Sequence, residues 1–170
     1  MKQIAKFFAL AIVMIVFSTS TFAQVSATAS ATATIVTPIA ITKTTDMNFG
    51  NVAVSAALGT VILTPASARS TTGGVTLPAT PGTVTAAAFT VTGQANFTYS
   101  ITLPGVATTI TSGANNMTVD TFTSTPTPTG NLGAGGSQAL TVGATLHVAG
   151  SQPAGTYVSG TDFTVTVNYN

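Results

Sequence analysis

The stretch from Val25 to Val36 alternates strictly between apolar and small polar side chains over eleven residues. A period of two is that of a β-strand with one buried face, because successive side chains of a strand point to opposite sides. Pro38 ends the run, since proline has no amide proton for a ladder hydrogen bond. The segment predicts either a strand that another molecule accepts into its sheet or the first strand of the chain's own sandwich. Its apolar face consists of Val25, Ala27, Ala29, Ala31, Ala33 and Ile35.

Residues 1–23 have the organisation of an export signal. Lys2 and Lys6 precede an apolar run over 7–17, and small side chains lead to a cleavage site before Gln24. The apolar run is too short to cross a bilayer, and threonines interrupt every later apolar stretch. We therefore expect a signal peptide over 1–23 and a mature protein that is secreted to the cell surface or beyond, with no membrane span.

The mature chain has very few charges. Removal of the signal leaves Lys43 and Arg69 against Asp46, Asp120 and Asp162, a formal net charge of −1. Charged residues normally make up about a quarter of a soluble domain. Nothing basic remains to neutralise phosphates, so nucleic acid is not expected as a partner. A free monomer would lack the repulsion that keeps proteins apart, whereas an assembled fibre or a glycan-coated surface would not need it.

From residue 39 onward the chain reads as short β-strands separated by Gly, Pro and Asn. Threonine and valine dominate, both suited to a pleated surface, and no segment after the signal has the apolar stripe of a helix. Phe97–Leu103 is expected to be a central strand, and Ser124–Ser137, rich in Pro and Gly, a flexible loop. The pattern predicts a single all-β domain over 38–170, an antiparallel β-sandwich, preceded by an N-terminal extension over 24–37.

Side chains able to catalyse are scarce. His147 is the only histidine, and it alternates with apolar neighbours, so we expect it to face solvent. No cysteine occurs, and the three aspartates form neither a calcium loop nor the paired carboxylates of a glycosidase. We predict no catalytic, cofactor-binding or metal-ligating residue, and no enzyme.

Two asparagines begin sequons for glycosylation, Asn96 in Asn96-Phe97-Thr98 and Asn116 in Asn116-Met117-Thr118. The Ser/Thr tracts over 26–34 and 123–129 are further candidates, for O-linked glycans. Covalent glycans are therefore a candidate modification of the mature chain.

Three long stretches, residues 31–52, 72–104 and 152–169, resemble a secreted bacterial family known as domain of unknown function 4402. More distantly, both ends of the chain are similar to pilin-type subunits of the chaperone–usher and spore-coat-U kinds. The matching motifs are Met47-Asn48-Phe49-Gly50 with Val52, Pro153-Ala154-Gly155-Thr156-Tyr157, and the closing stretch Phe163–Tyr169.

The pilin resemblance implies an incomplete immunoglobulin-like sandwich whose missing strand comes from the N-terminal extension of the next subunit. It also implies a head-to-tail homopolymer, joined through residues 25–36, that forms an extracellular filament or pilus-like fibre. A periplasmic chaperone and an outer-membrane usher are candidate partners on the same ground. The chain departs from many such pilins because it has no disulfide and its donor-like stretch is rich in alanine.

Two other functions remain open at this point. One is a monomeric, self-complemented coat or surface protein, which would keep residues 25–36 in its own sheet. The other is a carbohydrate-binding adhesin, for which the absence of tryptophan leaves few aromatic platforms.

Overall fold

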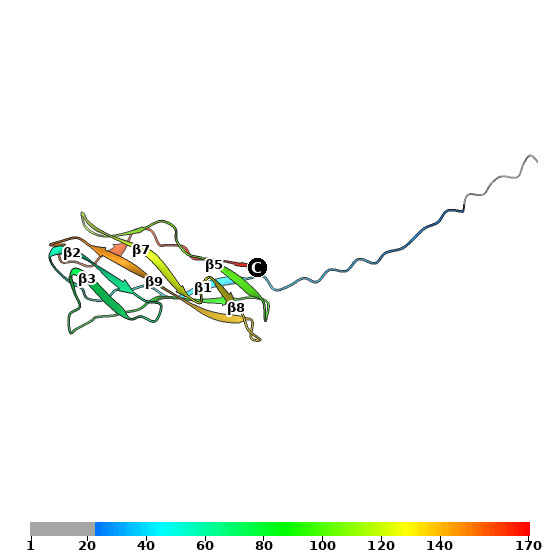
Figure 1. Ribbon diagram of the computed structural model, residues 1–170, viewed down its shortest axis with the longest axis horizontal. Coiled ribbons are helices and arrows are strands. Elements are labelled where there is room, and N and C mark those ends of the chain that lie inside the picture. Colours follow the sequence, from blue (N-terminus) through cyan, green and yellow to red (C-terminus); the bar gives the residue numbers. More distant parts are fainter. Residues whose placement is uncertain (1–22) are drawn as a thin grey trace, which may run out of the picture. The chain divides into compact units, whose positions relative to one another are not determined.

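The computed structural model describes residues 23–170, so the expected signal peptide lies, except for Ala23, outside the described residues. The described part contains eleven β-strands and no helix (Figure 1). All strand pairs are antiparallel, which confirms the predicted all-β antiparallel class. The strands are β1 Ala40–Thr45, β2 Ala53–Leu63, β3 Arg69–Thr76, β4 Ala87–Thr92, β5 Thr98–Thr102, β6 Thr108–Ser112, β7 Asn115–Thr125, β8 Thr129–Asn131, β9 Ser137–Val148, β10 Val158–Ser159 and β11 Thr166–Tyr169.

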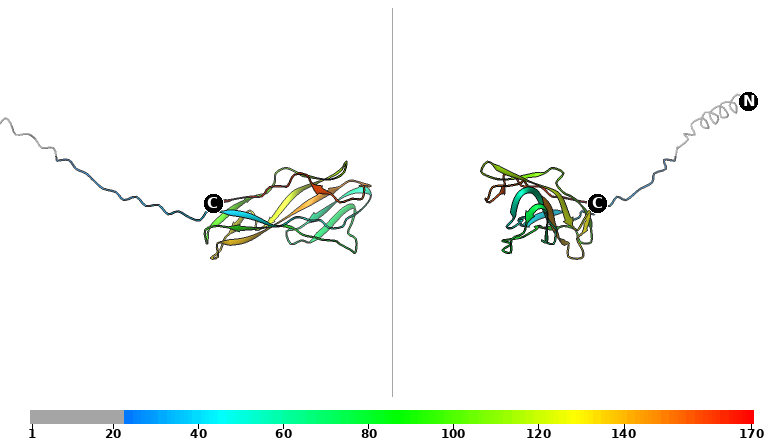
Figure 2. Two further views of the ribbon diagram at one scale, coloured as in Figure 1. Left: turned by 180° about the vertical axis from the view of Figure 1, so that it is seen from behind. Right: turned by 60° about the vertical axis from the view of Figure 1, so that its left-hand side comes forward.

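The larger sheet has eight strands and is organised around β9. Its main order is β1-β4-β9-β7-β6-β10, and the β2–β3 hairpin joins through β2. The first half of β9 pairs with β4, with Leu140 opposite Phe89, and the second half pairs with β2, with Leu146 opposite Val61. Because β4 and β2 follow one another along the same edge of β9, the sheet curls, as Figure 2 shows.

The smaller sheet has three strands in the order β11-β5-β8. The expectation of a central strand at Phe97–Leu103 is confirmed, because β5 lies in the middle of this sheet and Tyr99 is fully buried. The phenol of Tyr99 donates a hydrogen bond to Gln138 Oε1 at 2.9 Å, which links β5 to the start of β9.

The apolar core has two clusters of buried side chains. The first joins the two sheets, and the second lies within the curl of the larger sheet, under β2, β7 and β9. The first cluster comprises Ala87, Val91, Tyr99, Leu132, Leu140, Val142, Val165 and Val167. The second comprises Val61, Val75, Val119, Ala144, Leu146 and Val148.

The stretch Ser124–Ser137 is not the unstructured loop that its composition predicted. It contains the end of β7 and the whole of β8, and Leu132 has no exposed surface. The amide of Leu132 donates to the carbonyl of Phe97 at 3.0 Å, and its carbonyl accepts from the amide of Ser137 at 2.9 Å. The prolines and glycines shape a tight path that carries one apolar side chain into the core.

The N-terminal stretch 23–39 contributes no strand to either sheet, and the first strand begins at Ala40. Its residues 23–35 are exposed. Val25 and Ile35, at the two ends of the alternating apolar face, are 93% and 97% exposed.

Candidate functional site: a candidate assembly surface

Two strands at the edges of different sheets lie close together. β1 forms the edge of the larger sheet, where it pairs only with β4, and β11 forms the edge of the smaller sheet, where it pairs only with β5. Although they belong to different sheets, β1 and β11 are in contact. Each strand has a second edge whose backbone amides and carbonyls meet no other strand of residues 23–170.

Partly exposed apolar side chains gather along these two strands and the segments that flank them. Ile39, Ile41 and Met47 lie on or beside β1, and Phe163 and Tyr169 lie on the C-terminal segment. All five pack against the first core cluster but are only partly buried. The first cluster is therefore partly exposed along β1 and the C-terminal segment, and four further partly buried side chains lie on or beside β4, β5 and β7.

At one end of this surface, three residues form a closed set of hydrogen bonds that we call the Thr37 ring. The amide of Thr37 donates to Gln94 Oε1 at 3.2 Å, and the phenol of Tyr169 donates to the carbonyl of Thr37 at 2.7 Å. The same phenol oxygen accepts from the amide of Gln94 at 2.6 Å. The Thr37 ring ties the start of the body to its last strand.

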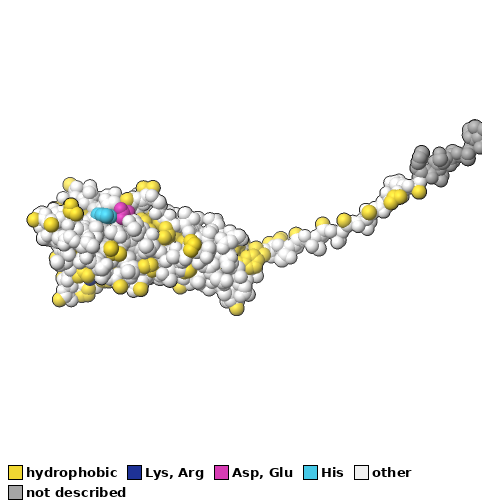
Figure 3. Space-filling model, viewed as in Figure 1, with side chains coloured by type: hydrophobic (Ala, Val, Ile, Leu, Met, Phe, Trp, Pro, Cys, Tyr) yellow, Lys and Arg dark blue, Asp and Glu magenta, His cyan; other side chains and the backbone are white. Residues whose placement is uncertain are grey.

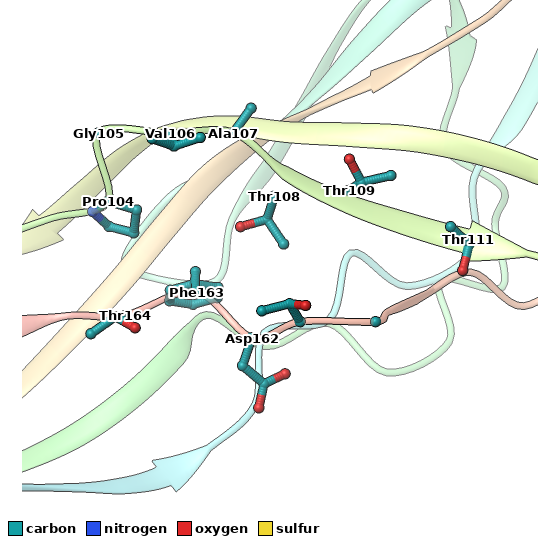
Figure 4. A pocket seen from close by; sticks show the side chains of 12 residues that line it. Pro104, Gly105, Val106, Ala107, Thr108, Thr109, Thr111, Asp162, Phe163 and Thr164 are labelled. Atoms are coloured by element: carbon teal, nitrogen blue, oxygen red, sulfur yellow. The ribbon is translucent and has the colours of Figure 1, made fainter.

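A hollow of about 560 Å³ opens where the C-terminal segment crosses between the sheets. On one side β5 pairs with β11 and on the other β6 pairs with β10, and the ladder is interrupted between them. Figure 4 shows Pro104 and Val106 on one wall and Phe163 on the other, with the Asp162 carboxylate turned away from the opposite wall. Phe163 packs against Phe122 with ring centroids 4.9 Å apart.

His147 is exposed on the outer face of the larger sheet, as the sequence predicted. Its Nε2 lies 2.8 Å from Asp120 Oδ1, a pairing that the scattered aspartates of the sequence did not suggest. This hydrogen bond is the main reason why the pKa of the Asp120 carboxyl is lowered, and the hydrogen bond that the hydroxyl of Thr121 donates lowers it further by a smaller amount. Figure 3 shows the pair on a surface that is otherwise mostly uncharged.

A second pair of ionisable side chains lies at the C-terminal end of β1. Lys43 and Asp46 form an exposed ion pair at 2.6 Å, whose hydrogen bond raises the pKa of Lys43. No group of three or more His, Cys, Asp or Glu side chains within residues 23–170 is placed to hold a metal ion. The free edges of β1 and β11 and the apolar side chains beside them make up the candidate site.

The residues predicted as sites from the sequence lie as follows. The six apolar side chains of the alternating segment are all exposed and outside the strands. Asn96 occupies an exposed turn with a φ of 64°, and Asn116 is exposed on β7, so both sequons lie at the surface. Their glycosylation stays a prediction. The Thr37 ring and the His147–Asp120 pair were not foreseen, because both depend on strand register.

One family model matches the chain over residues 39–169, and its description is Domain of unknown function (DUF4402). No curated protein and no solved structure matches the chain. Within residues 23–170, no helix is long and apolar enough to cross a membrane.

Proposed function

The chain belongs to the DUF4402 family, and from the order of its strands we propose that it is a structural subunit of an extracellular bacterial filament. On this proposal the mature subunits join head to tail, each accepting residues 25–36 of a neighbouring copy as an additional strand. The protein is then secreted, has copies of itself as its main partners and carries out no catalysis.

The observation that carries the proposal is a strand order with one position unfilled. Immunoglobulin-like sandwiches have strands A, B, E and D in one sheet and strands C, F and G in the other. The path β1-β4-β9-β7 corresponds to A-B-E-D, and β5 and β11 correspond to C and F, in the right sequence order. No strand of residues 23–170 pairs with β11 at the position of strand G. The other strands are additions to this arrangement.

The alternating segment has the properties that a strand at this position needs. It has no charge, its apolar side chains lie on one face, and both ends of that face are almost fully exposed. Eleven residues in a strand span about 36 Å, at about 3.3 Å per residue. The C-terminal segment from Gly160 to Tyr169 is of similar length. A strand added there satisfies a row of backbone groups and covers the partly exposed apolar side chains.

Head-to-tail addition also follows from the symmetry of such a contact. The donor segment and the acceptor edge are different surfaces of the same chain, so each copy can both give and receive a strand. A contact of this kind propagates into a filament unless the rotation between copies closes a ring. A periplasmic chaperone and an outer-membrane usher are proposed as further partners, which would protect the open edge before assembly.

The two alternatives have less support. A self-complemented monomer would need residues 25–36 in its own sheets, whereas they lie outside every strand of the described chain. A sugar-binding adhesin would need aromatic faces beside polar groups. In the hollow near the C-terminal segment, Phe163 is the sole aromatic lining residue, and the Asp162 carboxylate is turned away from the opposite wall (Figure 4).

Deletion of residues 25–36 tests the proposal. Secreted protein that lacks them should fold but form no filaments, as measured by electron microscopy and by sedimentation. Filaments that persist in this variant would refute strand donation.

A matched pair of substitutions tests which face is buried. Ala31→Lys places an ammonium on the apolar face, and Thr32→Lys places the same charge on the opposite face. We expect Ala31→Lys to slow polymer formation at least about tenfold more, because a lysine cannot enter an apolar site without losing its hydration. Equal effects would show that the assigned face is wrong.

A further inference from the structure

Thr37 follows directly on the alternating segment, and both of its backbone polar groups are bound by side chains from the body. Its amide donates to Gln94 and its carbonyl accepts from Tyr169, while Gln94 and Tyr169 are themselves joined through the Gln94 amide. The backbone groups of an exposed segment usually form their hydrogen bonds with water. Here two side chains from distant parts of the chain replace that water and fix the position at which the segment begins.

The packing around Tyr169 holds its phenol in place. Tyr169 lies opposite Tyr99 in the β5–β11 ladder, and its ring meets that of Phe97 edge to face, with centroids 5.6 Å apart. Gly93 leaves the space that the phenol occupies, because a Cβ at this position would lie 2.2 Å from Tyr169 Oη. Two residues after Thr37, Ile39 packs against the first core cluster. The path of residues 37–39 is thus fixed at both ends.

A fixed path at 37–39 matters because of where β11 ends. The last residue of β11, Tyr169, touches Thr37, so the free edge of β11 starts beside the point where the alternating segment begins. To pair with that edge in its own subunit, residues 25–36 would have to reverse direction within 37–39 and run back antiparallel to β1. Reversal is therefore the condition for self-complementation.

The local sequence opposes such a reversal. Tight two-residue hairpin turns need a positive φ at the first central residue, and in one type at both. The ring of Pro38 fixes its φ at about −65°. A positive φ is strongly disfavoured for Thr37, because its side chain is β-branched. No residue from 35 to 39 has a positive φ. A reversal here would also break the hydrogen bonds of the Thr37 ring.

We infer that the Thr37 ring and Pro38 together direct residues 25–36 away from the acceptor edge of their own subunit, which leaves the segment to a second copy of the chain. Tyr169 and Gln94 are positioning residues in this arrangement, and they decide between intramolecular and intermolecular strand pairing. The inference rests on the proposed function for its biological meaning, but the restraint itself is a property of one subunit.

The test compares four full-length chains, secreted and purified as monomers at low concentration: the wild type, Tyr169→Phe, Pro38→Gly and the double variant. Tyr169→Phe removes the phenol hydroxyl but keeps the ring that meets Phe97. Hydrogen exchange measured by mass spectrometry reports whether the amides of residues 25–36 are bonded. We expect fast exchange in the wild type and exchange at least about tenfold slower in the double variant, because the released segment pairs with its own subunit.

Tyr157→Phe is the matched control, since the phenol of Tyr157 donates to the carbonyl of Pro153 and accepts from the amide of the Gln152 side chain, and it takes no part in the Thr37 ring. It should leave the exchange of residues 25–36 unchanged. Fast exchange in the double variant, or slow exchange already in the wild type, would overturn the inference.

Polymerisation of the same four chains at high concentration separates this inference from the proposed function. Loss of filaments in the double variant, together with slow exchange, supports both. Filaments in the wild type with fast exchange in all variants would overturn the restraint and leave strand donation standing. A wild type that never polymerises, with slow exchange in the double variant alone, would overturn strand donation and leave the restraint standing.

Discussion

Replacing Leu132 by alanine should destabilise the protein far more than the composition of its surroundings suggests. Leu132 lies in a stretch of Pro, Gly, Ser and Thr, yet it has no exposed surface and belongs to the core cluster that joins the two sheets. Its backbone is held on both sides by hydrogen bonds to Phe97 and Ser137. Because this anchored backbone cannot move inward, the cavity left by the side chain would persist. We expect a loss of about 3 kcal/mol, within the range for buried Leu→Ala changes.

Urea unfolding followed by circular dichroism measures this loss, and thermal unfolding should show a midpoint lower by about 6–12 °C. Leu58→Ala is the control, since this leucine is 74% exposed and should cost about 0.5 kcal/mol or less. Equal losses in the two variants would mean that the Pro- and Gly-rich stretch is not packed, and the assignment of Leu132 to the core would then be wrong.

Two further substitutions test other details of the fold. Gly130→Ala should cost about 1–3 kcal/mol, because its Cβ would lie 2.3 Å from the ring of the buried Tyr99, whereas Gly135→Ala, with open space around it, should be nearly neutral in the same unfolding assay. His147→Ala should raise the pKa of Asp120 toward 3.8, as measured by NMR titration of the carboxyl carbon. A lowered carboxyl pKa stabilises the fold fully above pH 3.8, and this contribution is lost as the pH falls through the lowered value, so the variant should be less stable than the wild type above pH 3.8 and the difference should vanish at lower pH. An unchanged titration of Asp120 would contradict the assigned cause.

The all-β class could be predicted from the sequence because alternation survives in the strands that bury one face. In Phe97–Leu103 and in Leu140–Val148 of β9, every second side chain is apolar, and those of Leu140–Val148 are buried. Because alternation is a local property of the sequence, it can be recognised without knowing which strands pair with the segment. This is why the central strand of the smaller sheet was correctly predicted.

Features that depend on contacts between distant segments could not be predicted from the sequence. The Ser124–Ser137 stretch has the composition of a loop, and only the tertiary fold decides that Leu132 points inward. The His147–Asp120 pair depends on the register of β7 against β9, in which Thr118 lies opposite His147 and Asp120 lies opposite Thr145. A different register would bring other side chains together, and the sequence of neither strand specifies the register.

For the candidate assembly surface, the sequence predicted a strand-forming segment but not its place. The alternation in Val25–Val36 predicts that one face of the segment is buried, but it does not indicate which molecule buries it. The resemblance to pilins implied a missing strand, but the residues did not show that β11 would have a free edge, because this depends on the pairing of β11 with β5 alone. The proposed donor segment could therefore be identified from the sequence, whereas the proposed acceptor edge could not.

The free edges of the described sheets differ in a way that favours β11 as the acceptor. Natural edge strands resist unwanted pairing through charges, prolines, bulges or very short length. β1 carries Lys43 and an irregularity beside it, β3 begins with Arg69, β8 follows Pro128, and β10 has only two residues. β11 has no charge, no proline and no break in its ladder with β5. An edge that lacks charge, proline and a bulge is open to uncontrolled pairing, so the proposed donation of a strand by a second copy would also cover this edge.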